Sequence, residues 1–317
     1  MHTDELIGES WEVSAVPSST SIISNGEYKG CDLISVINQQ PDEILGRAVN
    51  KKYQGKLPLL VKYIDAKRNL SIQVHPNDEM AMREHGKMGK TEMWYVIKAD
   101  PGAHLYVGFK KEITKEEYLQ RIADGTIIEV LADHHVKAGD VFYLPAGRVH
   151  AICGGILLAE VQQSSDITYR IFDYNRPGFD GKPRELHTDL AAKALDFQVD
   201  NNYRTEYSET TNKAIQIIDT PYFDVRVMEV SKPFHRGMRK YDSFVISMCI
   251  EGNCKIRIRG TGEEIVLKEG NSTLIPACVA DYDLFPIAGK TILLDAYIDN
   301  KRFRVREMIT RFFHSTK

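Results

Sequence analysis

The stretch VKAGDVFYLPAGRVHAI, residues 136–152, recurs in a looser form as VLKEGNSTLIPACVADY, residues 266–282. Each copy has the pattern of a strand, a turn of glycine and polar residues, a second strand, a Pro-Ala pair and a residue able to point inward. That residue is His150 in the first copy. Asp281 stands near the equivalent place in the second copy, which has no matching histidines. The repeat predicts two similar β-barrels, one with a metal site and one without.

The rest of the chain is mostly short β-rich runs bounded by Gly, Pro, Asp or Asn, which predicts a mainly β fold with a few short helices. In the first half, strands are expected at 33–39, 59–66, 70–76, 93–99, 104–110, 140–146 and 155–163. In the second half, they are expected at 222–231, 243–252, 254–260, 263–270, 272–277 and 291–298. Capping residues and helical periodicity predict helices at 77–84, 114–123 and 188–197.

A polar segment at 198–215, with little apolar periodicity, predicts the domain boundary. We therefore expect a metal-binding catalytic domain at 1–200 and a second domain without metal ligands at 215–317. Residues 301–317 are ambiguous between helix and strand.

Bulk properties exclude several classes of protein. The 317 residues are 43% hydrophobic and 27% charged, which is typical of a globular protein. A net charge of -3 argues against a nucleic-acid binder, and no apolar run approaches the roughly 20 residues that cross a membrane. The first residues do not have the pattern of a signal peptide. The five cysteines include no CxxC pair, which favours reduced thiols and a cytoplasmic location.

Four residues offer the donors of a divalent metal site. Gln73 and His75 are two apart in a run with strand character, so both side chains project the same way. A helix and a Gly86–Gly89 turn let the chain return and place Glu92 beside His75, and His150 arrives from a separate strand. Lys90, two residues before Glu92, would face the same space. Two imidazoles, a carboxylate and an amide oxygen form a plausible ligand set.

The segment SSDITYRIFDYNRPG, residues 164–178, contains Asp166, Arg170 and Arg176. Arg170 is flanked by apolar residues that favour burial, and a buried arginine needs an anionic partner. A sugar phosphate would supply one, because arginine binds phosphate oxygens bidentately. A metal beside this arginine predicts metal-assisted chemistry on an anionic substrate.

At these residues the chain resembles the type I mannose-6-phosphate isomerases, also called phosphomannose isomerases, and particularly their short bacterial form. The resemblance covers nearly the whole chain. It rests on the stretches GESWE (8–12), LSIQVHPNDEMA (70–81), GKTEMWYV (89–96), PAGRVHAI (145–152) and TYRIFDYNRPG (168–178).

The resemblance implies a cupin fold with two β-barrels, the second of them at 215–317. It also implies a carbohydrate-metabolising enzyme that interconverts mannose 6-phosphate and fructose 6-phosphate through an enediolate. The implied cofactor is one Zn²⁺ per chain, and Arg170 is the implied catalytic arginine. The implied metal ligands are Gln73, His75, Glu92 and His150.

The resemblance also places further residues around the sugar phosphate or the path of the proton. Lys90 and Asp166 are candidates for proton transfer, and Ser71, Lys90 and Arg176 are candidates for binding the substrate. Members of the family often have a histidine just before this lysine and a proline after it. Here these positions are Gly89 and Thr91, so this chain has no histidine there that could open the sugar ring.

Two other functions fit part of the pattern. His75, Glu92 and His150 also suit a mononuclear non-haem iron enzyme, although the extra ligand Gln73 and the nearby cations argue against it. A non-catalytic bicupin that binds sugar phosphates is the second alternative. Binding alone does not need the complete set of metal ligands, Lys90 and Arg170.

Overall fold

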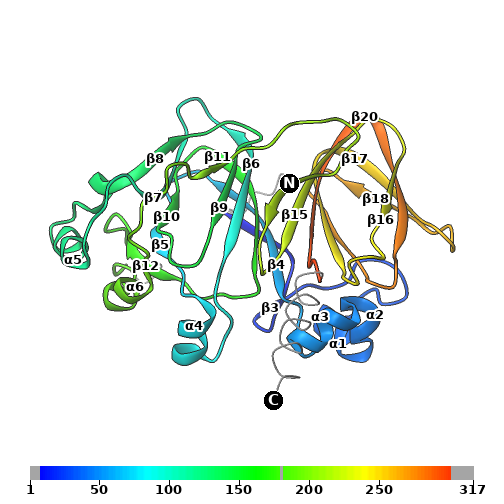
Figure 1. Cartoon of the computed structure of the whole chain (residues 1–317), viewed down its shortest axis with the longest axis horizontal. Coiled ribbons are helices and arrows are strands. Elements are labelled where there is room, and N and C mark those ends of the chain that lie inside the picture. Colours follow the sequence, from blue (N-terminus) through cyan, green and yellow to red (C-terminus); the bar gives the residue numbers. More distant parts are fainter. Residues whose placement is uncertain (1–7, 179–180, 301–317) are drawn as a thin grey trace, which may run out of the picture. The chain divides into compact units, whose positions relative to one another are not determined.

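The computed structural model describes residues 8–178 and 181–300, and the chain divides into two compact units. Among these residues, unit 1 contains 8–11 and 60–206, and unit 2 contains 12–59 and 207–300. The fold is mainly β, with antiparallel sheets and short helices, as predicted (Figure 1).

Two antiparallel sheets form unit 1. The six-stranded sheet contains, in spatial order, β1 (Glu9–Val13), β4 (Leu59–Ala66), β11 (Ile156–Gln163), β6 (Glu92–Ala99), β9 (Val141–Leu144) and β13 (Arg204–Thr205). The five-stranded sheet contains β12 (Tyr169–Phe172), β5 (Ile72–Val74), β10 (His150–Ile152), β7 (His104–Phe109) and β8 (Leu131–His135).

The core of unit 1 lies on both faces of the five-stranded sheet. On the inner face, Leu105 and Val107 pack in one buried cluster with Trp94 and Phe142 of the six-stranded sheet. On the outer face, the sheet packs against helices and the short 3-10 helix η1 (Ile127–Val130). The helices are α4 (Asp78–His85), α5 (Lys115–Ala123) and α6 (Thr188–Ala194), which Figure 1 shows beside this sheet. Packing on both faces holds the strands that carry the candidate site.

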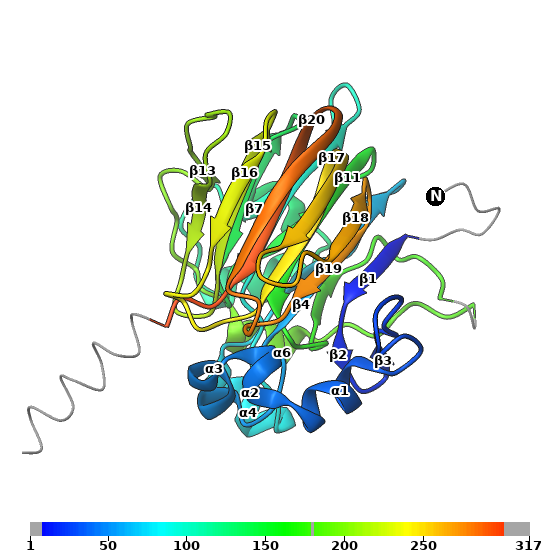
Figure 2. The same ribbon diagram turned by 90° about the vertical axis from the view of Figure 1, so that its right-hand side faces the viewer.

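Unit 2 contains a seven-stranded antiparallel sheet dominated by two long strands (Figure 2). Its strands are β14 (Ile215–Asp219), β15 (Asp224–Val230), β16 (Phe234–Gly237), β17 (Val245–Ile258), β18 (Glu264–Lys268), β19 (Ser272–Ile275) and β20 (Asp281–Tyr297). A small sheet of β2 (Ala15–Val16) and β3 (Ser19–Thr20) also belongs to this unit, as do the helices α1 (Leu33–Gln39), α2 (Pro41–Leu45) and α3 (Arg47–Tyr53). Helix α2 is tied to the sheet, because the carbonyl of Ile44 accepts a hydrogen bond from the amide of Ala277.

A buried ion pair lies inside unit 2. The guanidinium of Arg236 donates to Asp295 Oδ2 from NH2 at 2.8 Å and from Nε at 3.1 Å. Tyr282 is directly opposite Arg236 in the register of β16 and β20, and it is buried. Asp281, by contrast, pairs with Arg239 at 3.4 Å and is a third exposed. The side chain that points inward after the Pro-Ala turn is therefore that of Tyr282, and the assignment to Asp281 is wrong by one residue. On a strand, a shift of one residue places the side chain on the opposite face of the sheet.

The predicted helices and most predicted strands are confirmed, and one predicted strand is wrong. Residues 33–39 form helix α1. Their β-branched composition favoured a strand, but Leu33, Val36 and Ile37 are buried at helical spacing, and the side chain of Asp32 caps the first turn by accepting from Ser35 N. The strands expected at 243–252 and 254–260 are one continuous strand, β17.

The domain prediction of 1–200 and 215–317 stays a prediction, and the compact units divide the chain differently, because residues 12–59 belong to unit 2. Residues 301–317 lie outside the described part of the chain.

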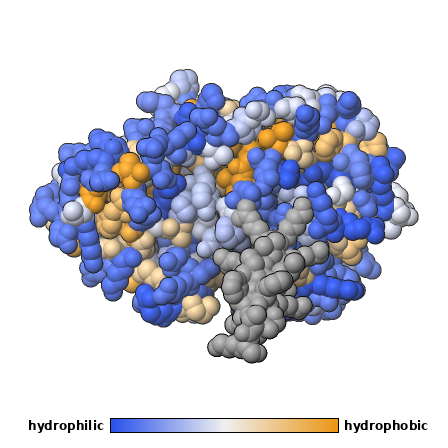
Figure 3. Space-filling model, viewed as in Figure 1, coloured by the Kyte–Doolittle hydropathy of each residue, from blue (hydrophilic) through white to orange (hydrophobic). Residues whose placement is uncertain are grey.

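All five cysteines are free, as expected. Within the described residues, no helix is long and apolar enough to span a bilayer. The face of the molecule in Figure 3 is largely hydrophilic.

Candidate active site

Three of the predicted site residues are neighbours across the five-stranded sheet. Strand β5 lies between β10 and β12, and Gln73 is directly opposite His150 on one side and Arg170 on the other. Residues directly opposite in antiparallel strands share one face and have Cβ atoms about 4.5–5.5 Å apart. The sheet therefore brings an amide, an imidazole and a guanidinium into one row.

His75, Glu92 and His150 form a compact buried cluster, in which one donor atom of each lies within 4.8 Å of the others. The Nε2 atom of His75 is 3.4 Å from Glu92 Oε2, and the Nε2 atom of His150 is 3.2 Å from Glu92 Oε1. The three side chains are at most 2% exposed. His75 follows β5, Glu92 begins β6 and His150 begins β10, so both sheets contribute.

The hydrogen bonding of this cluster is incomplete. Both ring nitrogens of His75, both oxygens of Glu92 and Nε2 of His150 are buried without a hydrogen-bond partner among the described residues, since their short contacts lack hydrogen-bond geometry. His150 Nδ1 lies 2.8 Å from the carbonyl of Arg148, which fixes its hydrogen there and leaves Nε2 as an acceptor. Buried polar atoms without partners are costly, so the donor set fits a metal ion.

The protonation states also fit a metal. Burial, followed by the positive charge of Lys90, holds the pKa of His75 well below its usual value, so the ring is neutral. Burial alone would raise the pKa of Glu92, but Lys90 and the two histidines outweigh it and hold the pKa well below its usual value. Neutral imidazole and ionised carboxylate are the forms that bind metals.

Lys90 lies in the same buried space, with Nζ 3.2 Å from Glu92 Oε2 and a side chain 6% exposed. The loop before it is fixed, because Asp78 Oδ1 accepts from the amide of Gly89. A Cβ at position 89 would meet the backbone of Asn77 and Asp78 at 2.5 Å. This packing leaves no space for a histidine before Lys90.

The remaining predicted residues differ in their surroundings. Ser71 is buried before β5. Asp166 is a third exposed and binds Lys87 Nζ at 2.6 Å, which lowers the pKa of its carboxyl. It does not join the buried cluster.

Arg170 NH1 donates to the carbonyl of Glu185, and its Nε is buried without a hydrogen-bond partner in the described chain. Arg176 NH1 donates to the carbonyl of Asn69.

The sequence analysis missed a second buried group on the six-stranded sheet. Glu160 accepts a hydrogen bond from Trp94 Nε1 at 2.9 Å and lies 3.4 Å from Lys62 Nζ. Burial lowers the pKa of Lys62, but the charges of Glu160, Glu9 and Glu92 outweigh it and raise that pKa overall. The Trp94 ring meets the His150 ring edge-on at 5.2 Å. The signal in the sequence was a charged residue inside each of the apolar runs 59–64 and 156–161, Lys62 in the first and Glu160 in the second.

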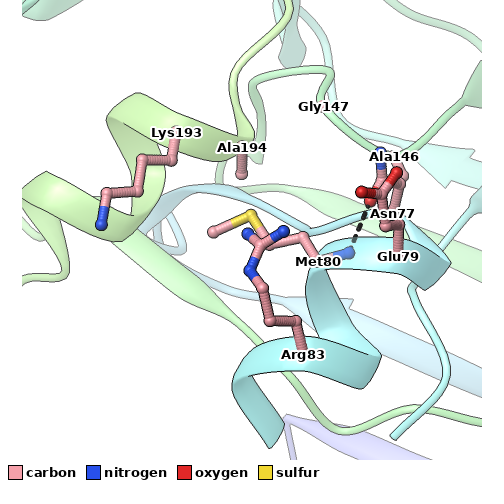
Figure 4. A pocket seen from close by; sticks show the side chains of 8 residues that line it. All are labelled: Asn77, Glu79, Met80, Arg83, Ala146, Gly147, Lys193 and Ala194. Carbon is pink, nitrogen blue, oxygen red and sulfur yellow. Dashed lines mark hydrogen bonds between the residues drawn. The ribbon is translucent and has the colours of Figure 1, made fainter.

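A pocket of about 210 Å³ lies between α4 and α6 (Figure 4). It is lined by Asn77, Glu79, Met80, Arg83, Ala146, Gly147, Lys193 and Ala194. None of the predicted site residues lines it. It adjoins the turn behind the cluster, where the amide of Gly147 donates to the carbonyl of His75.

Two family models match the chain. Residues 1–98 match the catalytic domain of type I phosphomannose isomerase, and residues 213–297 match the cupin domain of mannose-6-phosphate isomerase.

Similar proteins and solved structures are named mannose-6-phosphate isomerases. A mannose-6-phosphate isomerase of Bacillus subtilis is 35% identical over 281 residues, covering 87% of this chain and 86% of the relative. One of Streptococcus mutans is 34% identical, covering 88% and 85%. Among solved structures, a mannose 6-phosphate isomerase of Bacillus subtilis aligns with a TM-score of 0.80 and 32% identity, covering 92% of this chain and 90% of that one.

Proposed function

Because the chain belongs to the type I phosphomannose isomerase family, we propose that it interconverts mannose 6-phosphate and fructose 6-phosphate through an enediolate. The observation that carries this proposal is the buried cluster of His75, Glu92 and His150, whose inward donor atoms lack partners among the described residues, beside Arg170. An aldose–ketose isomerase has to stabilise negative charge on two adjacent sugar oxygens, and such a cluster offers the means.

We propose that one divalent ion, Zn²⁺, is held by His75, Glu92 and His150, with Gln73 as the fourth ligand. Gln73 is directly opposite His150, so both side chains project from the same face of the sheet. A bound ion would polarise the sugar oxygens at C1 and C2 as a Lewis acid. The donor set of nitrogen and oxygen is one that zinc accepts, although iron accepts it as well.

Strand geometry supports an orientation for the sugar phosphate. Successive residues on one face of a strand are about 7 Å apart, which is close to the distance between C2 and the phosphorus of an open-chain hexose 6-phosphate. Ser71 and Gln73 are related in this way, and Arg176 is anchored further along, at the carbonyl of Asn69. We therefore propose that C1 and C2 lie at Gln73, His150 and Arg170, and that Ser71 and Arg176 bind the phosphate.

We propose that Arg170 stabilises the enediolate charge. Its Nε is a buried donor without a partner among residues 8–178 and 181–300, and its NH1 is fixed by Glu185. A donor held in place before reaction acts without reorganisation as charge develops. We also propose that Lys90, rather than Asp166, carries the proton, because Lys90 Nζ lies in the cluster and Asp166 is paired with Lys87.

A coupled assay of the purified protein on mannose 6-phosphate, before and after chelation, tests the function. We expect fructose 6-phosphate to form and the activity to disappear with the metal. Oxygen uptake, or activity restored by iron alone, would support the iron enzyme instead. Tight binding of mannose 6-phosphate without product would support the non-catalytic bicupin.

We propose a small sugar phosphate as the partner, and neither a nucleic acid nor a membrane surface, given the net charge of -3. The five free cysteines support a cytoplasmic location.

A further inference from the structure

The segment after β12 makes a strained turn. Tyr174 and Asn175 have φ angles of +56° and +52°, and the amide of Arg176 donates to the carbonyl of Asp173 at 3.1 Å. Two central residues with positive φ, closed by this hydrogen bond, indicate a turn of type I′, in which glycine is usual. Side-chain-bearing residues keep such a backbone only where their surroundings hold it, and strain of this kind concentrates at functional sites.

Asp173 holds two arginines at this turn. Its carboxylate is buried, at 4% exposure. Arg184 binds it in a two-pronged arrangement, from Nε to Oδ2 and from NH2 to Oδ1, both at 2.6 Å. Arg176 NH2 donates to the same Oδ1, and Arg176 Nε donates to the carbonyl of Asp173. One carboxylate thus fixes the planes of two guanidiniums.

Positive charge exceeds negative charge in this group. The pKa of Arg170 is lowered, first by burial and next by the positive charge of Arg184. Arg176 and Arg184 share the single buried carboxylate of Asp173, and among the described residues the guanidinium of Arg170 donates only to the backbone carbonyl of Glu185. A guanidinium carries five N–H donors, and Arg184 gives only two of them to Asp173, so donors remain for a ligand.

We propose that Arg184 is a third arginine for the phosphate group of the substrate, and that Asp173 is the positioning residue that holds Arg176 and Arg184 toward it. This inference rests on the proposed function and names a specificity determinant of the same site. A phosphate dianion accepts hydrogen bonds from several guanidiniums at once and neutralises the excess charge. The competing explanation is that Arg184 only tethers its own segment to β12.

Steady-state kinetics of Arg184→Gln test the proposal. We expect KM for mannose 6-phosphate to rise on the order of 10- to 100-fold, as for the loss of a charged hydrogen bond, with kcat within about 3-fold. The inhibition constant of inorganic phosphate should rise in parallel. Arg184→Lys should restore part of the loss, because lysine keeps the charge without the planar fork. Asp173→Asn should also raise both KM for mannose 6-phosphate and the inhibition constant of inorganic phosphate.

The matched control is Arg121→Gln, which also removes an arginine paired with carboxylates in unit 1, Glu117 and Glu129 on and after α5. It should leave KM and the phosphate inhibition constant unchanged. If Arg184→Gln lowers the melting temperature and leaves both constants at wild-type values, Arg184 is only a tether and the proposal fails. A fall in kcat at constant KM would also overturn it.

Titration calorimetry with inorganic phosphate separates this proposal from the proposed function. If the wild-type protein does not isomerise mannose 6-phosphate, the function is wrong, and the phosphate site is still judged by calorimetry. Weaker phosphate binding by Arg184→Gln than by the wild type supports the site. Equal binding contradicts it. Arg184→Lys serves for the comparison if Arg184→Gln does not fold.

Discussion

The rings of His75 and His150 lie 4.9 Å apart, centroid to centroid, and each directs Nε2 toward a different oxygen of Glu92. The two histidines approach from the five-stranded sheet, and Glu92 approaches from the six-stranded sheet. Their convergence gathers polar atoms from both sheets at one place inside the apolar core of unit 1, where they need a further partner.

Removal of one ligand should empty the metal site. In Glu92→Gln, the anionic donor between the two histidines becomes neutral, so we expect less than about a tenth of the wild-type metal content, with activity lost in proportion. Elemental analysis of the purified protein measures this. Glu116→Gln on α5, an exposed acid remote from the cluster, is the control. Full metal content in Glu92→Gln would contradict the ligand assignment.

Arg170→Ala should lower kcat by at least about 100-fold and leave the metal content unchanged, because it removes a preorganised donor and no ligand. Steady-state kinetics with metal analysis of the same sample check both. Turnover near the wild-type rate would remove Arg170 from the chemistry.

Lys62 and Glu160 should depend on each other for stability. Lys62→Met leaves Glu160 buried with Trp94 as its hydrogen-bond donor, so we expect a loss of about 3–5 kcal/mol in the free energy of unfolding. The double variant Lys62→Met, Glu160→Gln should recover at least about 1 kcal/mol of that loss. Urea unfolding measures both values. Strictly additive losses would show that the pair is not coupled.

Asp173 should make stability depend on acid pH. Burial would raise the pKa of its carboxyl, but the hydrogen bonds from Arg184 and Arg176 outweigh burial and lower it. A carboxyl whose pKa is lower in the folded state stabilises the protein above its unfolded pKa of about 3.9, and this contribution is lost as pH falls through the folded pKa.

The melting temperature of the wild type should therefore exceed that of Asp173→Asn by a constant margin above about pH 5. The margin should shrink as pH falls below about 4. A margin that is the same at every pH would mean that the charge of Asp173 contributes nothing.

Gly46→Ala should destabilise unit 2 more than Gly55→Ala. Both glycines have positive φ, +90° and +77°, so alanine at either costs about 1–3 kcal/mol in backbone strain. At position 46 the added Cβ would also meet the carbonyl oxygen of Asp242 at 2.1 Å, whereas at position 55 it meets nothing within 4 Å. We expect a further loss of about 1–3 kcal/mol at position 46. Equal losses in thermal or urea unfolding would show that the contact with Asp242 relaxes freely.

Local patterns predicted most of the elements. Residues 59–66 form the expected strand β4, and α4 begins after Asn77 and ends at Gly86, because capping and turn residues act over a few positions. Residues 33–39 were misassigned because β-branched composition and helical spacing coexist there, and the burial that decides between them comes from tertiary packing.

Partners from distant strands could be predicted only in part. Gln73, His75, Glu92 and His150 stood out as a donor set, and the buried cluster contains three of them. Lys62 and Glu160 did not stand out, because a lone charge in an apolar run does not identify its partner. The order β4-β11-β6 in the sheet brings them together. The pairing of Asp173 with Arg184 depends likewise on the path of the chain after β12.

Each unit contains a buried carboxylate with a cation of the chain beside it. In unit 2, Arg236 neutralises Asp295, and both belong to the chain itself. In unit 1, Lys90 lies beside Glu92 in the same way, but the ring nitrogens of His75 and Nε2 of His150 that gather there have no hydrogen-bond partner among the described residues. Loss of the proposed ion should therefore weaken the contact between the two sheets of unit 1 and leave the interior of unit 2 unchanged.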